Sequence, residues 1–587
     1  MIDTESRIRD HLTFLYGHQE ADSVWPQLQV LLSEFQERHP HLRMAAPPSR
    51  RLTERDAILI TYADQFREAG VAPLHTLYQV LTETLQRPVS GVHILPFFPY
   101  SSDDGFSVID YTQVDPDFGT WEDVERLGRD FRLMVDAVVN HVSRHSMWFQ
   151  RFLADDSDYA DWFITVKPGT DLSMVVRPRA LPLVHAVQTA SGEKWVWTTF
   201  SEDQIDLNYA HPPVLLRMIE ILLLYVAKGA QIIRLDAIAY AWKKIGTPCI
   251  HLPEAHRLVK LLRAVLDAVA PSVLLITETN VPHEENISYF GDPLPTGGGT
   301  DEAQMVYQFP LAPLVMHSIL TADARVISQW AAGLETPAPQ ATFFNFTASH
   351  DGVGVMPARG LLGHADIQML VDRTLAHGGQ VSFRTNHDGS QSVYELNVSY
   401  FDALSDPAGD EPLALQVQRF ICSQAIMLAL AGVPGIYVHS LLGSRSWQDG
   451  MAQTGRRRSI NRQKLDAVAL RRELADPTSL RHQVFNAYGR LLRARASEPA
   501  FHPYGGQQVL SLSDSVFALL RFSPDRTSRV LCLHNVSAES QPAQFGPSGS
   551  ALPPGTWRDL LTGATYDVGA DPLSVLLPPY AVRWLRI

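Results

Sequence analysis

The chain has 587 residues, of which 45% are hydrophobic and 19% are charged, and its formal net charge is −14. This composition is typical of a folded globular protein and excludes an intrinsically disordered one. Nucleic acids and anionic membranes are excluded as general partners, because binding to either of them needs a basic excess.

The cysteines and the apolar stretches give little sign of special processing. Cys249, Cys422 and Cys532 are far apart and form no CxxC pair, so they predict neither a zinc site nor a disulfide framework. We interpret them as small buried hydrophobic residues. The first ten residues lack the apolar core of a secretory signal. The longest apolar stretch, around residues 219–227, is shorter than the roughly 20 residues of a membrane span. We therefore expect a soluble cytoplasmic protein.

An N-terminal helical extension is predicted over residues 1–52. Ile8, Leu12 and Leu15 have the spacing of one apolar helix face. The extension ends in a Pro- and Arg-rich stretch, APPSRR (46–51), which we interpret as a short link to the rest of the chain.

From about residue 53, eight short apolar runs alternate with amphipathic helical segments. Strands that are buried on both faces read as near-continuous apolar runs, and their alternation with helices is typical of parallel βαβ units. The count of eight predicts a (β/α)8 TIM barrel made of residues 53–141 and 211–498, and an open doubly wound sheet is the alternative. The runs are AILITYAD (57–64), VHILPFFP (92–99), LMVDAVVNH (133–141), QIIRLDAI (231–238), VLLITET (273–279), MVYQFPL (305–311), TFFNFTASHD (342–351) and GIYVHS (435–440).

Two connections of this barrel are longer than a crossover helix requires. About 90 residues separate the third and fourth runs, and we expect residues 142–210 to form an inserted subdomain after the third strand. A second long connection follows the seventh run and contains FRTNHDGSQSVYELN (383–397). Alternating segments separated by turn residues then predict a C-terminal antiparallel β domain over residues 499–587.

Ionisable residues stand at the ends of most runs. The C-terminal ends of parallel barrel strands meet at one mouth, where active sites lie, so residues far apart in the chain can converge there. Taken singly, an acid at such a position is often a helix N-cap, as Asp64, Asp136 or Asp206 can be, and a histidine is often a packing residue. Together the strand ends predict an active site, and they carry Asp64, His93, Asn140, His141, Arg234, Asp236, Glu278, His350 and Asp351.

Cleavage of a glycosidic bond needs two carboxyl groups, one to protonate the leaving oxygen and one to attack the anomeric carbon. Arg234 lies two residues before Asp236 on one face of a predicted strand, where its guanidinium favours the ionised carboxylate. We therefore interpret Asp236 as the nucleophile. Glu278 follows the apolar LLIT, which can raise its pKa, and we interpret it as the general acid and base. Asp351 and the flanking histidines are expected to hold sugar hydroxyls.

These motifs resemble the four successive strand motifs of the α-amylase family, with a further motif near the end of the inserted segment. The resemblance extends from about residue 57 to the C-terminus. It implies a retaining double displacement with Asp236 as nucleophile, Glu278 as acid and base, and Asp351 as third carboxylate. The matching segments are DAVVNH (136–141), IRLDAI (233–238), ITET (276–279), FTASHD (346–351) and QIDLN (204–208).

Other segments resemble the sucrose phosphorylase branch of that family. They are ITYAD (60–64), GVHILPFFPYSSDDGFSVIDY (91–111), RPRALPL (177–183), ASHDGVG (348–354) and SINR (459–462). The sugar-holding residues that the branch implies are Asp64, His93, Arg234, His350 and Arg462. It implies a phosphate or acceptor role for Arg179, and Arg177 is a second candidate, because a guanidinium binds phosphate or carboxylate through paired hydrogen bonds.

One departure from the amylase pattern bears on metals. Many amylases follow RLDA with a Lys-His pair whose histidine helps to bind calcium, whereas Ile238, Ala239 and Tyr240 follow it here. A structural calcium is therefore not expected, although Asn140 is present. We predict no required metal and no cofactor.

Within the branch, the chain is most similar to the glucosylglycerate phosphorylases. The matching features are the N-terminal extension, WTTFSEDQIDLNY (197–209), GTPCIHLPEAH (246–256), ITETNVPHEENISYFG (276–291) and SVYELNVSYFDAL (392–404). The resemblance implies reversible phosphorolysis of an α-glucoside, with glucosylglycerate as first choice, to α-glucose 1-phosphate and free acceptor. The partners are then a small sugar substrate and inorganic phosphate.

Several alternatives stay open. Sucrose, sucrose 6′-phosphate or glucosylglycerol can replace glucosylglycerate as the substrate, and an α-glucosidase or transglucosylase of the same family would use the same carboxylates. A catalytically silent interaction protein is the least expected, because all three acids are present. The sequence does not indicate the oligomeric state.

Overall fold

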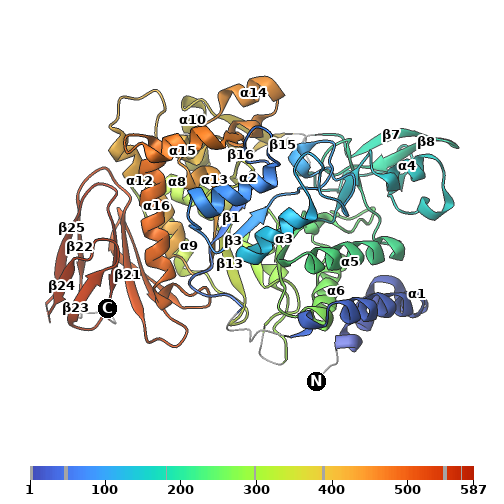
Figure 1. Cartoon of the computed structure of the whole chain (residues 1–587), viewed down its shortest axis with the longest axis horizontal. Coiled ribbons are helices and arrows are strands. Elements are labelled where there is room, and N and C mark those ends of the chain that lie inside the picture. The colour runs from blue at the N-terminus through green and yellow to red at the C-terminus, as the bar shows by residue number, and fades with distance from the viewer. Residues whose placement is uncertain are drawn as a thin grey trace.

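Eight parallel strands close into a barrel at the centre of the molecule (Figure 1). The structure is a computed structural model and describes residues 4–44, 51–179, 181–295, 299–385, 390–546, 552–569 and 571–587. Each barrel strand overlaps one of the eight predicted runs, so the (β/α)8 barrel is confirmed and the open doubly wound sheet is wrong. The strands are β1 (Ile58–Thr61), β3 (Gly91–Ile94), β4 (Arg132–Val138), β10 (Ala230–Asp236), β11 (Leu274–Thr277), β12 (Met305–Tyr307), β13 (Thr342–Asn345) and β17 (Val433–Tyr437).

The barrel strands are short and almost wholly buried, as their apolar sequences require. All four residues of β1 and of β11 are buried, because the barrel interior covers one face and the helices cover the other. The predicted apolar runs are longer than the strands that they form. β17, for example, ends at Tyr437, and the next residues form the helix α13 (Val438–Leu441). The predicted strand end at Ser440 is therefore wrong. The polar residues of the runs therefore lie partly at the ends of the strands, as Asp236 does, and partly in the loops that follow them.

Amphipathic helices surround the barrel and connect its strands. Their ends follow local chemistry: α16 begins after Ser479, whose hydroxyl accepts a hydrogen bond from the His482 amide at 3.0 Å. The helices are α2 (Pro73–Gln79, continued by a π-helix over Val80–Thr84), α3 (Trp121–Asp130), α5 (Pro212–Ala227), α6 (Pro253–Val269), α7 (His283–Ile287), α8 (Leu311–Thr321), α9 (Arg325–Ala332), α12 (Leu413–Ala429), α15 (Ala467–Ala475) and α16 (Leu480–Ala496).

Between β4 and β10 the chain forms small antiparallel sheets that project from the barrel mouth, at the right of Figure 1. One sheet pairs β5 with β9, and the other has the order β6-β8-β7. The elements of this inserted segment are β5 (His141–Ser143), α4 (Met147–Leu153), β6 (Thr165–Val166), β7 (Val184–Thr189), β8 (Gly192–Trp197) and β9 (Gln204–Asp206).

The connections after β13 and β17 also rise above the barrel. The first contains a β-hairpin whose strands bring residues 380–385 beside 391–397, and its residues 386–389 lie outside the described part of the chain. The second contains an irregular helical stretch that ends at Asn461. These elements are β14 (Val353–Gly354), α10 (His364–Ala376), β15 (Gln380–Thr385), β16 (Gln391–Asn397), α11 (Tyr400–Leu404), α14 (Gln448–Thr454), η9 (Arg457–Asn461) and β18 (Leu465–Asp466), which pairs with β2 (Phe66–Arg67).

The N-terminal helix α1 (Thr4–Arg38) packs against α5 and α6 on the outside of the barrel. Arg7 forms an ion pair with Asp267 at 2.9 Å, and the Tyr16 hydroxyl donates a hydrogen bond to the Tyr209 carbonyl at 2.9 Å. The predicted helical extension therefore braces the end of the inserted segment. Of the predicted link at 46–51, only Arg51 lies within the described residues.

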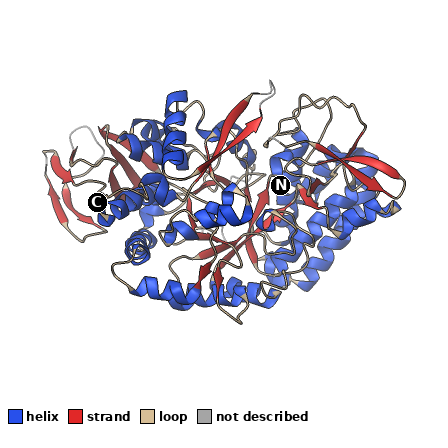
Figure 2. Cartoon of the chain, turned by 90° about the horizontal axis from the view of Figure 1, so that it is seen from above, coloured by secondary structure: helices blue, strands red, loops and turns tan. Residues whose placement is uncertain are grey.

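The C-terminal part forms a six-stranded antiparallel sheet beside a two-stranded one, at the end of the molecule opposite the inserted segment (Figure 2). Trp557 and Trp584 are buried and pack in the interior of this part of the chain. Buried Arg521 fastens this sheet to the barrel by donating to the Ala429 carbonyl at 2.6 Å. The strands are β19 (Gln507–Ser513), β20 (Val516–Phe522), β21 (Arg529–Asn535), β22 (Gln541–Phe545), β23 (Gly555–Asp559), β24 (Thr565–Val568), β25 (Leu573–Leu577) and β26 (Val582–Arg586).

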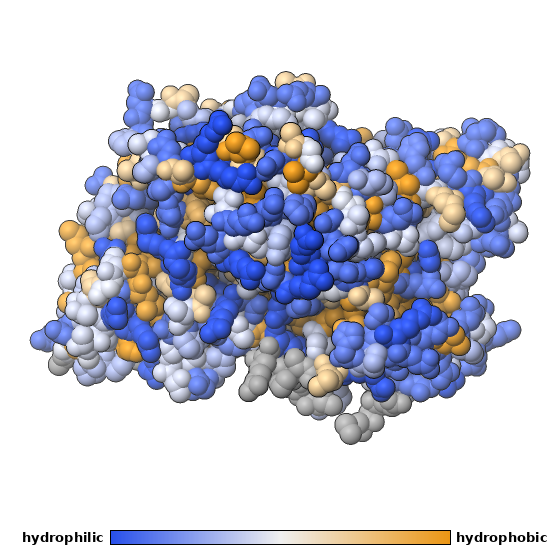
Figure 3. Space-filling model, viewed as in Figure 1, coloured by the Kyte–Doolittle hydropathy of each residue, from blue (hydrophilic) through white to orange (hydrophobic). Residues whose placement is uncertain are grey.

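The cysteines and the surface agree with the expectations from composition. All three cysteines are buried and unbonded to one another, as predicted. Within the described ranges, every helix is too short or too polar to cross a bilayer. The face seen in Figure 3 is mainly hydrophilic, with apolar residues in scattered patches.

Candidate active site

Asp236 and Glu278 lie side by side at the ends of two neighbouring strands. Parallel pairing of β10 with β11 sets Leu235 beside Thr277, so the next residues on the two strands are Asp236 and Glu278. The Glu278 amide donates to the Leu235 carbonyl at 3.2 Å, and the Ala237 amide donates to Glu278 Oε2 at 3.3 Å. Two acids 42 positions apart in the chain are therefore held together by backbone hydrogen bonds.

The guanidinium of Arg234 contacts both acids. Its Nη1 lies 2.7 Å from Asp236 Oδ1, and its Nη2 lies 3.9 Å from Glu278 Oε2. Nη1 also forms an ion pair with Asp136 on β4. The side chain lies over the rings of Phe106 and Tyr307, at 5.6 and 5.7 Å from their centroids. Because a single guanidinium joins all of these groups, the two predicted catalytic carboxylates flank one small volume.

The two acids differ in pKa in a way that suits two roles. Burial, followed by the charges of Asp236 and Asp351, raises the pKa of Glu278 to about 7 against the pull of Arg234. Glu278 is therefore able to hold a proton near neutral pH, as predicted. Arg234 lowers the pKa of Asp236 and so favours its ionised form, as expected. Burial, which is the largest influence, and the charge of Asp136 act in the opposite direction and leave that pKa raised.

Asp351 lies in the loop after β13 and is held by two arginines. Nη1 of Arg458 lies 2.5 Å from Asp351 Oδ1, and Nη2 of Arg462 lies 3.6 Å from the same oxygen. Burial alone would raise the pKa of Asp351, but the positive charge of Arg458 holds it well below its usual range. Asp351 is therefore a permanent carboxylate, in contrast to Glu278.

The histidines at the strand ends have separate surroundings. His350 stacks on Phe106, with ring centroids 4.9 Å apart, and burial lowers its pKa to about 3, so it is neutral. His93 is fully buried, and its Nε2 lies 2.6 Å from Asp136 Oδ2. His93 thus contacts the carboxylate that also binds Arg234.

These side chains enclose a small pocket of about 70 Å³ at the barrel mouth. The sequence-predicted residues in its wall are Asp236, Glu278, Asp351, Arg234, His141, His350 and Arg179. A neighbouring pocket of about 400 Å³ shares Arg179 and Arg458 with it and is also lined by Arg462. Arg177 lines another pocket, of about 750 Å³, so it and Arg179 point to different places.

Asp64 and His93 do not belong to the described wall of the small pocket. Asp64 is buried and forms ion pairs with Arg67 at 2.7 Å and with Lys464 at 2.5 Å. The Lys464 ammonium lies 3.7 Å from the centroid of the Tyr62 ring, at the edge of the barrel mouth. Asp64 therefore contacts residues at the edge of the barrel mouth and not the small pocket itself.

Several residues of the site were not predicted from the sequence. Asp136 was open to interpretation as a helix cap, yet it lies inside β4 and accepts hydrogen bonds from Arg234 and His93. Arg458 bridges Asp351 and Glu395, with Glu395 Oε1 at 2.5 Å. The one sequence signal for Arg458 is its place at the end of a run of three arginines (456–458) directly before SINR. Glu395 and Tyr394, on β16, also line the pocket.

The polar site at Asn140 is filled by an ammonium group. Lys243 Nζ donates to Asn140 Oδ1 at 2.6 Å and to the Tyr240 carbonyl, and it forms an ion pair with Asp206. Asp206 also accepts from the Thr199 amide at 2.8 Å. In the part of the chain that is described, no group of three or more His, Cys, Asp or Glu side chains is arranged to hold a metal ion.

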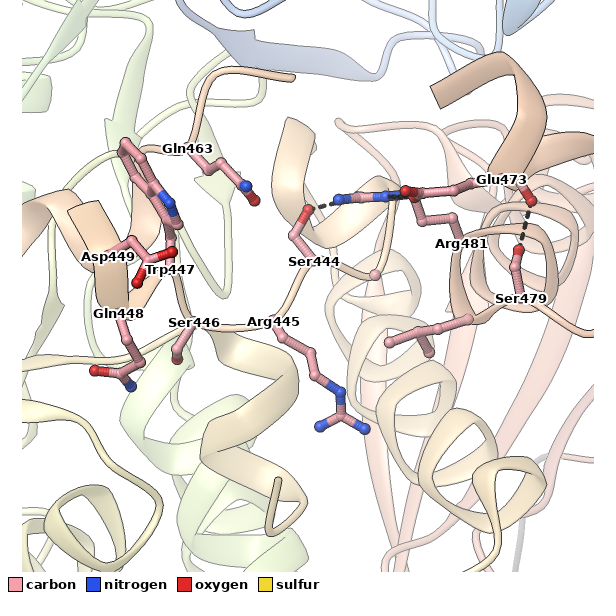
Figure 4. A pocket seen from close by; sticks show the side chains of 12 residues that line it. Ser444, Arg445, Ser446, Trp447, Gln448, Asp449, Gln463, Glu473, Ser479 and Arg481 are labelled. Carbon is pink, nitrogen blue, oxygen red and sulfur yellow. Dashed lines mark hydrogen bonds and ion pairs between the residues drawn. The ribbon is translucent and has the colours of Figure 1, made fainter. Parts of the chain in front are cut away.

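Another pocket, of about 510 Å³, lies between α14, α15 and α16 (Figure 4). Arg481 points to Ser444 and Glu473, and its Nη1 donates to Ser444 Oγ at 2.8 Å. Arg445 points away from them and pairs with Asp402 at 2.8 Å. The arginines of this pocket are thus neutralised by residues of the chain, and none of the predicted site residues lines it.

Comparisons with known proteins agree with this site. The catalytic domain of alpha amylase matches residues 86–351. The glucosylglycerate phosphorylase of Spirochaeta thermophila is 51% identical over 99% of this chain and 98% of that protein. The glucosylglycerate phosphorylase of Escherichia coli is 44% identical over 99% of this chain and 100% of that protein.

A solved structure also has the same fold. The crystal structure of sucrose 6F-phosphate phosphorylase from Thermoanaerobacter thermosaccharolyticum has a TM-score of 0.72 at 25% identity, over 90% of this chain and 99% of that chain. Identity of this extent from end to end, on a barrel with these strand-end acids, shows that the chain belongs to the α-amylase family, on the branch of the sucrose and glucosylglycerate phosphorylases.

Proposed function

We propose that the protein is a retaining glucoside phosphorylase that converts an α-glucoside and inorganic phosphate reversibly into α-glucose 1-phosphate and a free acceptor. The observation that supports this proposal is that the guanidinium of Arg234 contacts both Asp236 and Glu278, while the pKa of Glu278 is raised to about 7. The names of the full-length relatives supply the substrate class, glucosylglycerate. We further propose that it acts in the cytoplasm.

In the first step, the Asp236 carboxylate attacks the anomeric carbon of the glucoside. Glu278 donates its proton to the glycosidic oxygen, the bond to that oxygen breaks, and glycerate leaves with the proton on its hydroxyl. The product is a glucosyl ester of Asp236 with inverted configuration. Protonated Glu278 and ionised Asp236 are thus both required at once.

In the second step, an oxygen of inorganic phosphate attacks the anomeric carbon of the ester. Glu278, now a carboxylate, accepts the proton from that phosphate oxygen, and the Asp236 carboxylate is released. The second inversion gives α-glucose 1-phosphate. Glu278 is protonated again, so the site is ready for another glucoside.

The remaining residues of the site have proposed roles in binding. Asp351 and His350, in the pocket wall, are suited to hold glucose hydroxyls. Arg234 orients the two catalytic acids. Arg462 supports this wall because its Nε donates to the His350 carbonyl at 2.8 Å. Asp64 and His93 complete the proposed sugar site, His93 through Asp136.

Phosphate must compete with water, which is far more concentrated, so the site needs positive groups beside the reacting carbon. Arg179 stands in the wall of the small pocket and lies 3.3 Å from Asp103 Oδ2. A guanidinium binds phosphate through paired hydrogen bonds. We propose Arg179 as the phosphate ligand, with Arg458 contributing charge from the same wall.

An acceptor screen tests the proposed function. The protein is mixed with α-glucose 1-phosphate and, separately, with D-glycerate, glycerol, fructose or fructose 6-phosphate, and the release of phosphate is measured. We expect the fastest release with glycerate. Faster release with another acceptor would change the substrate, and dominant formation of free glucose would replace the phosphorylase by a hydrolase.

A variant of the nucleophile tests whether the protein is an enzyme, either a phosphorylase or a hydrolase, or a catalytically silent interaction protein. Asp236→Asn removes the attacking carboxylate but keeps the shape of the side chain, so we expect no measurable turnover with any acceptor. Circular dichroism of the variant serves as the folding control. Full activity of the variant would refute the assignment of Asp236.

A further inference from the structure

The pocket of about 750 Å³ that contains Arg177 opens beside the general acid; we call it the Arg384 pocket. It shares Asn280 and Tyr394 with the small catalytic pocket, so the two are continuous neighbours. Its wall comes from the inserted segment, from the loop after β10, from the loop after β11 and from the β15–β16 hairpin. The polar residues of this wall include Arg177, Tyr240, His251, Asn280, Arg384 and Tyr394.

The position of Glu278 decides which part of a substrate this pocket can receive. Asn280 follows Glu278 by two residues and lines both pockets. Tyr240 lines the Arg384 pocket, and its pKa is raised by burial and, next to it, by the charge of Glu278. The glycosidic oxygen must lie against Glu278 when it is protonated. The acceptor, which is attached to that oxygen, therefore extends toward the Arg384 pocket.

The charges of the two pockets differ. Acids outnumber arginines in the wall of the catalytic pocket, and the arginines there are paired with them, so an acceptor carboxylate placed there would meet like charges. The acids are Asp236, Glu278, Asp351, Asp103 and Glu395, and the arginines are Arg179, Arg234 and Arg458. In the Arg384 pocket, Glu285 is the one acidic residue of the described wall, and Arg177 and Arg384 are both basic. An acceptor that is an anion is therefore stabilised when its charge points outward into this pocket.

Within the described residues, no carboxylate pairs with the arginines of the Arg384 pocket, in contrast to Arg179 and Arg458 of the catalytic pocket. Arg179 pairs with Asp103, and Arg458 pairs with Asp351 and Glu395. For Arg384 the described residues supply one hydrogen bond, from its Nε to Ser392 Oγ at 3.3 Å, and no carboxylate. Among the described residues, its terminal nitrogens therefore face the pocket without a carboxylate partner.

Asn280 offers a second contact for the same ligand. Its Oδ1 is buried at the junction of the two pockets and has no hydrogen-bond partner among the described residues. A buried polar atom without a partner is costly, and a bound hydroxyl group that donates to it removes that cost. A small acceptor with both a hydroxyl and a carboxylate fits this pair of contacts.

We propose that the Arg384 pocket binds the acceptor and that Arg384, aided by Arg177, holds the carboxylate of a small hydroxy acid. Arg384 is then the residue that makes the enzyme prefer such acids to uncharged polyols. This inference rests on the proposed function, because it concerns the acceptor of the same reaction. A guanidinium suits the task, since it binds a carboxylate through two parallel hydrogen bonds.

Glycerate and glycerol share a carbon skeleton and differ in the carboxylate, so their comparison in Arg384→Gln tests the proposal. Phosphate release from α-glucose 1-phosphate is measured with each acceptor. We expect the ratio of kcat/KM for glycerate over glycerol to fall by about 10-fold or more, through a higher KM for glycerate. Reaction with glycerol should fall much less than reaction with glycerate, because glycerol has no carboxylate for Arg384 to bind.

Two further variants sharpen the test. Arg384→Lys keeps the charge but not the paired hydrogen bonds, so we expect an intermediate ratio. Arg373→Gln removes an exposed arginine of the nearby helix α10 that lies outside all of these pockets, and it serves as the matched control with an unchanged ratio.

Each outcome for Arg384→Gln decides the proposal. An unchanged ratio would show that the carboxylate is bound elsewhere, and equal losses with glycerate and glycerol would show a general structural role; both results overturn it. Failure of the proposed function is visible separately in the wild-type protein, as formation of free glucose or as preference for an uncharged acceptor.

Discussion

The guanidinium of Arg458 lies 2.5 Å from Asp351 Oδ1 and spans from there to Glu395 on the β15–β16 hairpin. This contact ties the third carboxylate of the barrel to a loop that precedes the arginine by about 60 residues. Its positive charge holds the pKa of Asp351 well below the usual range although burial acts in the opposite direction. Asp351 consequently stays ionised over the whole working range of pH.

Arg458→Gln should impair activity through Asp351. Without the guanidinium, the pKa of Asp351 rises, so the acidic limb of the pH profile of kcat/KM should move to higher pH. We expect a loss of kcat/KM on the order of 100-fold near neutral pH. Arg458→Lys, which keeps the charge, should restore part of the activity and of the profile. An acidic limb that does not move in Arg458→Gln would contradict this role.

Glu278 should set the basic limb of the pH profile. Because its pKa is raised to about 7 and the glycoside step needs its proton, kcat/KM for glucosylglycerate should fall as the pH rises above about 7. Glu278→Gln should lose activity by about 10²–10⁴-fold and lose that limb. With α-glucosyl fluoride, whose leaving group needs no proton, the variant should keep its first step. Equal losses with both substrates would argue against the acid role.

The same pKa predicts how stability depends on pH. Folded Glu278 binds its proton more tightly than the unfolded chain does, because its pKa is about 7 rather than 4.5. Its contribution to stability is therefore complete below about pH 4.5 and is lost as the pH rises through 7. Glu278→Gln should raise the melting temperature relative to the wild type more at pH 8 than at pH 5. An equal difference at both values would show that burial does not penalise the carboxylate.

Lys243 should be essential for stability rather than for chemistry. Lys243→Met leaves Asp206 buried without its counter-charge, which should lower the free energy of unfolding by about 3–5 kcal/mol. Urea unfolding measures this loss, and Lys244→Met, at the exposed neighbour, is the control. Adding Asp206→Asn to Lys243→Met should recover part of the loss. Full stability of the single variant would refute the bridging role.

Chelation should leave the wild-type protein unaffected. An ammonium group already supplies positive charge to Asn140 and Asp206, so no ion is needed between the inserted segment and the barrel. After exhaustive treatment with EDTA, we expect the same activity and the same melting temperature. A fall in both that calcium reverses would show that a metal site exists.

The barrel was predictable because strands that are buried on both sides leave a strong apolar signal. The positions of Asp236 and Glu278 followed from the rule that parallel strand ends meet, and the structure brings the two acids together as expected. The rise in the pKa of Asp236 was not predictable, because it depends first on the burial of Asp236 and then on the charge of Asp136, which shares Arg234 with it across strands far apart in sequence.

Other parts of the site lacked a periodic signal altogether. Arg458 lies in an irregular stretch after the last barrel strand, where no pattern indicates which of several arginines turns inward. Arg177 and Arg179 were grouped as one set, but the chain bends at Pro178 and sends them to different pockets. The orientation of such loop residues depends on tertiary packing, which local spacing does not encode.

The buried acids and arginines of the mouth are linked by shared partners: Asp136, Asp236 and Glu278 by Arg234, and Asp351 and Glu395 by Arg458. Removal of any one of these residues leaves a buried opposite charge without its partner and without water. Natural variation at these positions should therefore proceed by joint replacement of an acid and its base, and a lone exchange at either should be rare among descendants that still work.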